Sequence, residues 1–282
     1  MKNSAIDFGC MTKFNNELKK IISFVDMKLI DTHTHLYVDD FKEDIDEVIK
    51  RANAEGVEKF YLPAIDSSET PSLIELEKKY PEKVFAMAGL HPCSVKENYK
   101  DELEKIEEQL AEREFAAIGE TGLDFYWETT FSMQQYESLH IHAQWAIQYK
   151  RPLVLHTRNA MQETIDVVKE YKGKGLYGVF HCFSGTEENA KDIIDLGFLL
   201  GIGGVLTFKN SSLADAIKNI GLEYLVLETD SPYLAPVPFR GKRNESSYLK
   251  YIVEKLAEVK SVSVEEAAQQ TSKNAEFLFS KK

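Results

Sequence analysis

Residues 28–35 read Lys28-Leu29-Ile30-Asp31-Thr32-His33-Thr34-His35, a short apolar run that ends in an acid and two histidines. Short continuous apolar runs are typical of strands that are buried on both faces of a parallel sheet. Side chains two apart on an extended segment point the same way, so His33 and His35 are placed to hold one metal ion together. No glycine-rich turn follows this run, and such a turn is the usual mark of an open, doubly wound sheet.

Seven more apolar runs follow along the chain, and longer amphipathic segments separate them. The runs cover residues 57–65, 84–90, 115–119, 153–156, 176–181, 198–202 and 224–227. The segments with helical periodicity cover residues 44–54, 69–79, 101–112, 132–150, 160–171, 186–195, 211–219, 247–258 and 264–279. Eight strands alternating with helices predict an α/β fold, a closed (β/α)₈ TIM-type barrel, with an open doubly wound sheet as the alternative.

No low-complexity linker divides the chain, so we expect residues 27–282 to form a single domain. Residues 1–26 differ from the rest, because Phe14, Leu18 and Ile21 fall near helical spacing without a strand pattern around them. This segment has no continuous apolar core of the kind found in signal peptides. We expect an N-terminal extension that contains a short helix and has no catalytic role.

Composition excludes several classes of protein. The chain of 282 residues has 34 lysines and arginines against 46 acids, a formal net charge of −12. Such an acidic protein is not expected to coat duplex DNA over a broad face. No apolar run approaches the roughly 20 residues that span a bilayer, so we expect no membrane association. The three cysteines are far apart and form no Cys-x-x-Cys pair, which favours a reducing, cytoplasmic location.

Side chains that bind metal ions gather at the carboxyl ends of the predicted strands. They are His33, His35, Glu120, His156, His181 and Asp230, with Glu120 placed at the end of the fourth strand. In a (β/α)₈ barrel these ends meet at one mouth, which carries the active site. Four nitrogens and two carboxylates suit two divalent ions better than one, and the mixed set fits Zn²⁺, Mn²⁺ or Fe²⁺ more naturally than Mg²⁺. The sequence therefore predicts a dinuclear metal site at the C-terminal mouth.

Other side chains near the predicted mouth are candidates for substrate contacts. His91 follows the third run, and Tyr126 with Trp127 follows the Glu120 segment, where an aromatic ring can stack on a base. Positive charge suited to phosphate comes from Arg158, Lys209, Arg240 and Arg243, of which Arg158 and Arg240 are the stronger candidates. By contrast, His140 and His142 lie inside a predicted helix, and we assign them structural roles.

Eight segments of the chain together resemble the TatD-related family of metal-dependent deoxyribonucleases. They are Asp31-Thr-His-Thr-His-Leu, Gly89-Leu-His-Pro, Gly119-Glu-Thr-Gly-Leu-Asp-Phe-Tyr, Leu155-His-Thr-Arg, His181-Cys-Phe-Ser-Gly, Thr207-Phe-Lys-Asn, Glu228-Thr-Asp-Ser-Pro-Tyr-Leu-Ala-Pro and Arg240-Gly-Lys-Arg-Asn-Glu. They occur in family order over nearly all of residues 27–282. The resemblance implies a hydrolase on a TIM-type barrel, in which Glu120 bridges two metal ions. It also implies that His33, His35 and Asp230 bind one ion and that His156 and His181 bind the other.

The family's usual activity implies DNA cleavage that depends on divalent metal, including exonuclease action at 3′ ends of single strands. Two ions about 3.5–4 Å apart can supply the nucleophile and neutralise the charge that phosphodiester hydrolysis develops. Asp230 is the expected acceptor of a proton from the attacking water, and Glu120 is expected to set the spacing of the ions. We expect single-stranded or frayed DNA ends as the partner, and the sequence shows no obligate protein partner.

Two other functions are consistent with the same ligands. An enzyme of the amidohydrolase type would cleave an amide, a lactone or an aminoacyl ester. Such sites often use a carboxylated lysine as the bridge, so Glu120 at that place favours the nuclease. The last alternative is a protein that binds nucleic-acid ends through metal without cleaving them.

Overall fold

A computed structural model describes residues 27–127 and 129–280 of the chain, so the predicted N-terminal helix within residues 1–26 lies outside the described residues. The described part contains eight parallel strands, in line with the predicted number. They are β1 (Leu29–Asp31), β2 (Val57–Leu62), β3 (Val84–Ala86), β4 (Ile118–Asp124), β5 (Leu153–Arg158), β6 (Gly178–Phe180), β7 (Phe198–Ile202) and β8 (Leu225–Leu227). The order β1-β2-β3 forms one sheet and β4 to β8 form the other.

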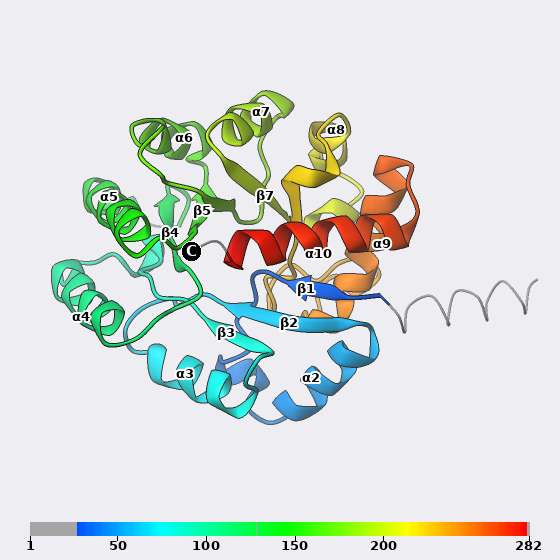
Figure 1. Ribbon diagram of the computed structural model, residues 1–282, viewed down its shortest axis with the longest axis horizontal. Helices are drawn as coiled ribbons and strands as arrows, with labels where there is room; N and C mark the ends of the chain where they lie inside the picture. The colour runs from blue at the N-terminus through cyan, green and yellow to red at the C-terminus, as the bar shows by residue number, and fades with distance from the viewer. Residues whose placement is uncertain (1–26, 128, 281–282) are drawn as a thin grey trace, which may run out of the picture.

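Helices surround the strands on the outside (Figure 1). They are α2 (Ile45–Ala54), α3 (Thr70–Lys79), α4 (Tyr99–Glu112), α5 (Ser132–Tyr149), α6 (Met161–Lys169), α7 (Glu187–Asp195), α8 (Leu213–Ile217), α9 (Leu249–Lys260) and α10 (Val264–Ser280). Each overlaps a segment with predicted helical periodicity. Five short 3₁₀ turns, η1 (Asp39–Phe41), η2 (Pro92–Ser94), η3 (Gly204–Thr207), η4 (Leu222–Tyr224) and η5 (Ser246–Tyr248), complete the described elements. None of the helices in this part of the chain has the length and apolar character that a membrane crossing requires.

Hydrogen bonds at two seams join the sheets into the TIM-type barrel. Between β3 and β4, Gly119 N–H donates to Ala88 O at 2.7 Å. Between β8 and β1, the N–H and the hydroxyl of Thr32 both donate to Leu227 O at 3.0 Å. Hydrogen bonds of this kind bring the first strand against the last, nearly 200 residues later in the sequence. The alternative of an open doubly wound sheet is therefore wrong.

A buried acid reinforces the seam between β1 and β8. Asp31 accepts hydrogen bonds from the N–H and the hydroxyl of Thr229, at 2.9 and 2.6 Å. Thr34 and Ser231 add a contact of 2.6 Å between their hydroxyl groups. Because these groups are all fully buried, each hydrogen bond that is lost leaves a polar atom without a partner.

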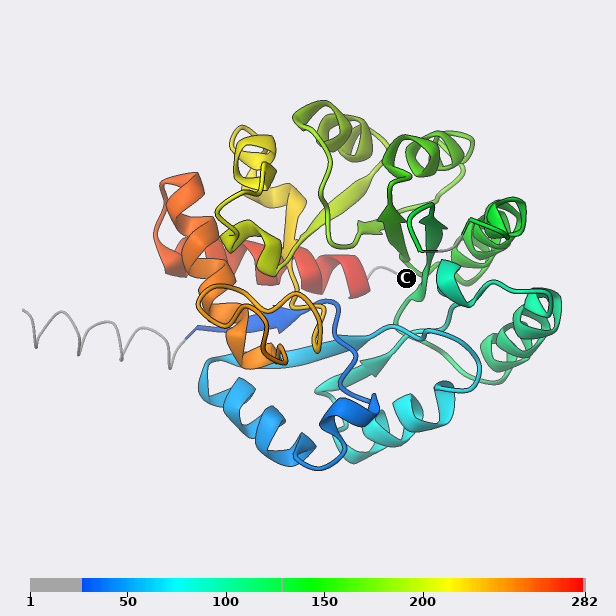
Figure 2. The same cartoon turned by 180° about the vertical axis from the view of Figure 1, so that it is seen from behind.

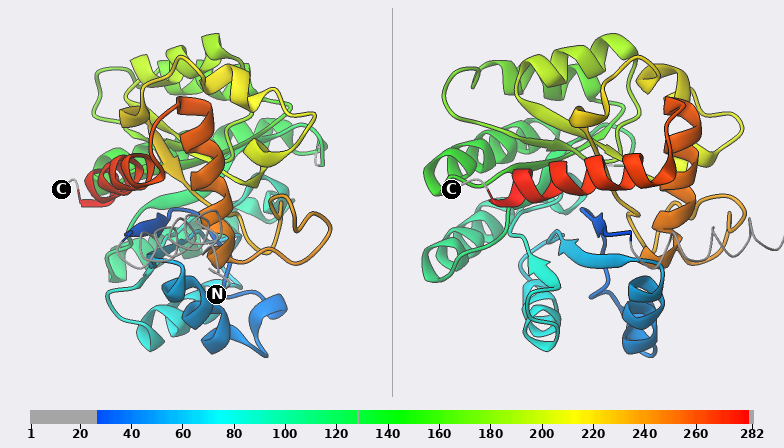
Figure 3. Two further views of the ribbon diagram at one scale, coloured as in Figure 1. Left: turned by 90° about the vertical axis from the view of Figure 1, so that its right-hand side faces the viewer. Right: turned by 45° about the vertical axis from the view of Figure 1, so that its right-hand side comes forward.

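The barrel interior is apolar at one end and polar at the other. Val154, Val179 and Val226 meet α10 residues such as Leu278 in a buried cluster, so α10 closes the amino-terminal end of the barrel. In Figure 1 this helix crosses in front of the strands, and Figure 2 shows the opposite end, where the loops that follow the strands gather. Figure 3 shows α10 and the long loop between β8 and α9 on opposite sides of the barrel.

Side chains two residues beyond this apolar layer face the mouth. His156 follows Val154 in β5, and His181 follows Val179 just past β6. Strand side chains alternate in direction, so the residue two positions along projects to the same interior. The two-residue alternation of strand side chains thus accounts both for the apolar layer at the amino-terminal end of the barrel and for the histidines at its mouth.

The predicted boundary of the fourth strand is wrong. The apolar run ends at Gly119, but β4 spans Ile118–Asp124 and Glu120 lies within the strand rather than at its end. The missed part reads Glu-Thr-Gly-Leu-Asp, which lacks the apolar continuity used for prediction. All of β4 is buried, and its two acids, Glu120 and Asp124, face the ring nitrogens of His156 in β5 at 2.9 and 3.0 Å. Tertiary contacts therefore decide where this strand ends.

We expect Thr229→Val to lower stability by about 2 kcal/mol, because it removes the hydroxyl that donates to the buried Asp31 carboxylate. For a chain of this size this corresponds to a fall in Tm of roughly 4–8 °C, measured by thermal unfolding. The matched control is Thr164→Val in α6, whose buried hydroxyl donates to the backbone of its own helix, at Ala160 O and 2.8 Å. Equal Tm losses in the two variants would contradict a special role for the seam.

The histidines in α5 are structural, as predicted. His140 Nδ1 lies 2.8 Å from the Tyr171 hydroxyl. In the buried ring of His142, Nδ1 lies 2.7 Å from Ser138 O and Nε2 accepts from Leu90 N–H at 3.0 Å. A carbonyl only accepts and an N–H only donates, so His142 is neutral with its proton on Nδ1. Burial lowers its pKa from 6.5 to about 4.

The lowered pKa of His142 predicts a loss of stability in acid. The unfolded chain binds the proton below pH 6.5 and the folded chain only near pH 4, so stability falls as the pH drops through this window. His142→Gln removes the titrating group. We expect the stability gap between wild type and this variant to narrow by about 2 kcal/mol between pH 7 and pH 5 in urea unfolding. A stability difference between wild type and His142→Gln that stays constant from pH 7 to pH 5 would contradict the lowered pKa of His142.

Candidate metal centre

The six predicted ligands lie together at the mouth of the barrel. His33 and His35 come from the segment after β1, Glu120 from β4, His156 from β5, His181 from the residue after β6 and Asp230 from the segment after β8. The imidazoles of His33 and His35 face the same oxygen, Glu120 Oε2, at 3.1 and 3.8 Å from their Nε2 atoms. The predicted common direction of these two histidines is therefore confirmed.

The two carboxylate oxygens of Glu120 face different groups of histidines. Oε2 faces His33 and His35, whereas Oε1 lies 2.9 Å from His156 Nδ1 and 3.7 Å from His181 Nε2. The carboxylate thus stands between two sets of nitrogen donors. This is the arrangement in which one carboxylate can bridge two cations.

Asp230 faces the His33 and His35 side from the last strand. Its Oδ1 lies 3.5 Å from His35 Nε2, 3.8 Å from His33 Nε2 and 3.9 Å from His181 Nε2. Burial alone would raise the pKa of this carboxyl, but the neighbouring imidazoles outweigh burial and hold it below its usual value. The same balance holds the pKa of Glu120 well below its usual value. Both acids are therefore anions at neutral pH.

The donor set fits divalent metal ions. His33, His181 and Asp230 have donor atoms within 4.8 Å of one another, and so do His33, His35 and Glu120. Among the described residues, His33 Nδ1 is buried without a hydrogen-bond partner, and the carboxylate nearest to the buried Nε2 is that of Glu120, at 3.1 Å. Buried polar atoms without a partner are costly, and a cation bound to such a nitrogen removes the cost. Mixed nitrogen and carboxylate donors suit first-row divalent ions.

Partners outside the cluster orient three of the histidines. The Tyr37 hydroxyl donates to Pro63 O at 2.7 Å, so it accepts from His35 Nδ1–H at 3.1 Å and leaves His35 Nε2 facing the cluster. His156 Nε2 lies 3.0 Å from Asp124 Oδ2, and His181 Nδ1 lies 2.9 Å from Glu228 Oε1. Each ring therefore turns its other nitrogen toward Glu120, as metal-binding histidines do when a carboxylate or hydroxyl fixes their tautomer.

A cavity of about 650 Å³ opens at this cluster. Arg158 and Trp127 line it, together with His91. The other predicted contacts lie elsewhere: Tyr126 is not among the lining residues, and Lys209 and Arg240 line a second cavity beside the first. Arg243, the weaker candidate, forms an ion pair with Asp44 at 2.7 Å.

Comparison with known proteins agrees with this geometry. A family model described as TatD related DNase matches residues 30–280. The chain belongs to the TatD-related DNase family.

Relatives in the TatD family cover almost the whole chain. The uncharacterized metal-dependent hydrolase YabD of Bacillus subtilis is 36% identical over 252 residues, which are 89% of this chain and 98% of the relative. YcfH of Escherichia coli K12, also named an uncharacterized metal-dependent hydrolase, is 37% identical and covers 90% of this chain and 96% of its own length. The crystal structure of YjjV, a TatD homologue from E. coli, has a TM-score of 0.85 at 29% identity and covers 89% of this chain and 98% of its own. The protein is thus a metal-dependent hydrolase of the TatD family.

Asp124 and Glu228 belong to this TatD-family centre, and the sequence-based prediction missed their roles. Asp124 lies at the end of β4, four residues beyond Glu120, and Glu228 lies two residues beyond the interior Val226. The alternation of strand side chains could have identified Asp124 and Glu228, because each lies an even number of residues after a side chain that faces the interior. A Cβ on Gly201 in β7 would stand 2.3 Å from Glu228 Oε2, so glycine leaves the room that this carboxylate occupies.

His91, a predicted substrate contact, has a donor atom within 4.8 Å of donor atoms of Glu120 and His156, but its tautomer differs from that of a ligand. Its Nδ1 accepts from Cys93 N–H at 3.1 Å, and burial lowers its pKa to about 3. The neutral ring therefore carries its proton on Nε2, which faces His156 Nδ1 at 3.3 Å and Glu120 Oε1 at 3.6 Å. An N–H in this position is suited to donate to an oxygen of a substrate.

We expect Glu228→Gln to weaken metal binding by about 10–100-fold, because it removes the charge that holds the His181 ring. Competition with a chromophoric chelator measures the affinity for Zn²⁺ and Mn²⁺. The matched control is Glu102→Gln, which removes another largely buried carboxylate that bonds to Ser67 N–H and lies outside the cluster. An affinity unchanged in Glu228→Gln, or lowered equally in both variants, would contradict the role of Glu228.

Proposed function

We propose that this TatD-family hydrolase is a deoxyribonuclease that uses two divalent metal ions to cleave phosphodiester bonds at single-stranded or frayed DNA ends. The observation that carries the proposal is the placement of Glu120, whose two oxygens face separate sets of histidines. Two ions held side by side are the usual device for phosphodiester hydrolysis. Action from the 3′ end rests on the resemblance to the family.

We assign the roles of the ligands from the family resemblance, and the two sides of the Glu120 carboxylate support this assignment. Glu120 would bridge the ions, with His33, His35 and Asp230 on one side and His156 and His181 on the other. When bound, the ions supply an activated water and neutralise charge on the phosphoryl group. Asp230 is an anion beside the cavity, so it is suited to accept the proton of the attacking water.

The substrate contacts are proposed from the walls of the cavity. Arg158 brings positive charge to a phosphate, and the Nε2–H of His91 can donate to one of its oxygens. Trp127 is 70% exposed and offers a ring for stacking on a base, while Tyr126 lies under Arg158. The cavity has the size of a site for one small ligand, so it suits the terminal nucleotide of a strand better than the side of a duplex.

An assay with labelled DNA tests the activity. Metal-stripped protein is incubated with single-stranded DNA labelled at its 5′ end, and Mg²⁺, Mn²⁺ or Zn²⁺ is added in turn. We expect stepwise shortening from the 3′ end, with no cleavage by Asp230→Asn. Absence of cleavage under every metal, with metal bound, would contradict the nuclease and favour an amide or ester substrate. Binding of DNA ends under single turnover without cleavage would favour the non-catalytic alternative.

We expect Glu120→Ala to reduce turnover at least about a thousandfold, because it removes a ligand from both ions. Metal content, measured by elemental analysis after dialysis, falls in the same variant. The control is Glu114→Ala, which removes a glutamate that is 85% exposed. Full activity with unchanged metal content in Glu120→Ala would contradict the bridging role.

A further inference from the structure

The arginines of this acidic chain divide into two groups. Arg51, Arg113, Arg151 and Arg243 form ion pairs with carboxylates, at 2.5–3.3 Å. Arg158 and Arg240 form no ion pair with any described residue, although the chain has 46 acids. Both unpaired arginines line cavities at the mouth of the barrel. The guanidinium groups that remain available to a ligand among the described residues are therefore both at the mouth.

Each unpaired arginine lies over an aromatic ring. The guanidinium carbon of Arg240 stands 3.7 Å from the centre of the Phe208 ring, and that of Arg158 stands 4.9 Å from the centre of the Tyr126 ring. Stacking holds the plane of a guanidinium while its N–H groups remain free at the edge. A planar group of five donors is suited to bind two oxygens of a phosphate.

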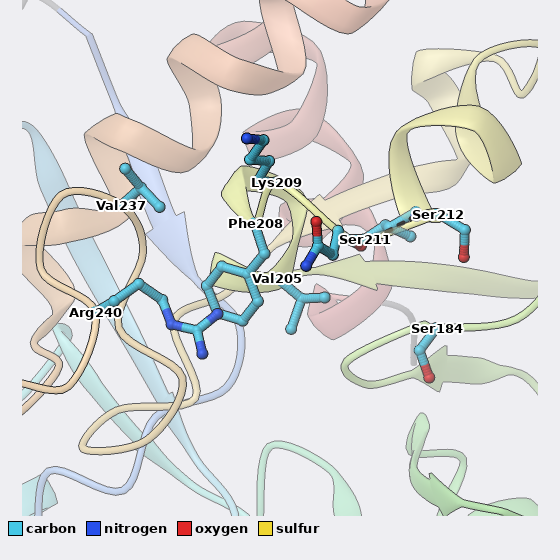
Figure 4. Close-up of a pocket in the computed structure, with 10 residues that line it drawn as sticks. Ser184, Val205, Phe208, Lys209, Ser211, Ser212, Val237 and Arg240 are labelled. Atoms are coloured by element: carbon cyan, nitrogen blue, oxygen red, sulfur yellow. Dashed lines mark hydrogen bonds between the residues drawn. The ribbon is translucent and has the colours of Figure 1, made fainter.

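The cavity at Arg240 has a volume of about 660 Å³ and is separate from the metal cluster. Ser184 and Val205 line both this cavity and the one at the metal centre, so the two are contiguous. Figure 4 shows Arg240 across the ring of Phe208, with Ser184 at the far end of the pocket. Lys209 and Ser211 also line it, and no acid does.

The walls of this cavity come from the loops that follow β6, β7 and β8. In (β/α)₈ barrels, loops after the last strands often form a phosphate site. The two positive side chains in the lining and the absence of acids give the cavity the character of such a site.

We infer that the cavity at Arg240 is a second phosphate subsite, which binds a phosphate of single-stranded DNA other than the one that is cleaved. The inference rests on the proposed nuclease function and adds a requirement to it. The preferred substrate carries at least two phosphates, one at the metal centre and one in the cavity that Arg240 and Lys209 line. The exposed ring of Trp127 at the metal-centre cavity suits an unpaired base, which favours single strands over duplex.

The test compares substrates with one phosphate and with several. Bis(p-nitrophenyl) phosphate reaches only the metal centre, whereas a 12-nucleotide single strand reaches both sites. We expect Arg240→Ala to lower kcat/KM for the 12-mer by about tenfold, mainly through KM, and to leave kcat/KM for the small diester within about twofold. Arg240→Lys keeps the charge but loses the planar group of donors. We therefore expect its kcat/KM for the 12-mer to lie between those of wild type and Arg240→Ala.

Lys172→Ala is the matched control. It removes an exposed positive charge from the loop between α6 and β6, at the opposite end of the barrel. We expect this variant to act as wild type on both substrates. Equal losses for Arg240→Ala and Lys172→Ala on the 12-mer would overturn the subsite, because they would reflect net charge alone.

Binding without turnover separates this inference from the proposed function. Fluorescence anisotropy of a labelled 12-mer with metal-stripped protein measures affinity as salt is varied. We expect Arg240→Ala to reduce the slope of log affinity against log salt by about 0.7, the amount for one lost contact with a single strand. If the wild-type protein cleaves no DNA but Arg240→Ala still reduces the slope for binding of the 12-mer, the proposed nuclease function is wrong and the phosphate subsite stands. If Arg240→Ala matches wild type in slope and in cleavage of the 12-mer, the subsite is wrong.

Discussion

The hydrogen-bonded seam between β1 and β8 is the contact on which the rest of the structure depends. It joins Asp31 and Thr32 to residues 227–229 and so brings His33 and His35 to Asp230. Closing a loop of nearly 200 residues costs conformational entropy, and the buried hydrogen bonds of the seam help to offset it. The buried Asp31 carboxylate, with two donors from one threonine, gives this seam both strength and a fixed register. Without that register the two histidines would not face the carboxylate of Glu120.

The metal cluster is held by two strand residues, Glu120 in β4 and His156 in β5, and by four residues in the segments that directly follow strands. Glu120 lies within the fully buried strand β4, where its N–H donates to Ala64 O at 3.2 Å, so its backbone is anchored beside the cluster. Tyr37, Asp124 and Glu228 then fix the rings that surround it. Catalytic constellations gain precision when their supports are rigid elements with satisfied outer hydrogen bonds. The anionic carboxylates leave a strong attraction for cations at the mouth.

Charge is distributed unevenly over the protein. A net charge of −12 would repel a nucleic acid, yet the arginines without ion pairs stand at the mouth. Elsewhere acids neutralise the arginines, as Asp44 does for Arg243. At the metal centre Arg158 stands beside three carboxylates, whereas the cavity at Arg240 is lined by two positive side chains and no acid.

The sequence by itself determined the number of strands, their alternation with helices and the identity of the six side chains that meet at the mouth. Local patterns suffice for these, because an apolar run or a histidine pair at a strand end depends only on nearby residues. Only the tertiary structure decided that β4 runs past Glu120 to Asp124, and that Glu228 faces His181 in the space left by Gly201. It also decided which arginines form ion pairs. Arg243 pairs with Asp44, which lies 199 residues away in the sequence, whereas Arg240, three residues before Arg243, forms no ion pair with a described residue. Contacts between residues so far apart produce no periodic pattern in the sequence, because the arrangement of the strands around the closed barrel determines which residues meet.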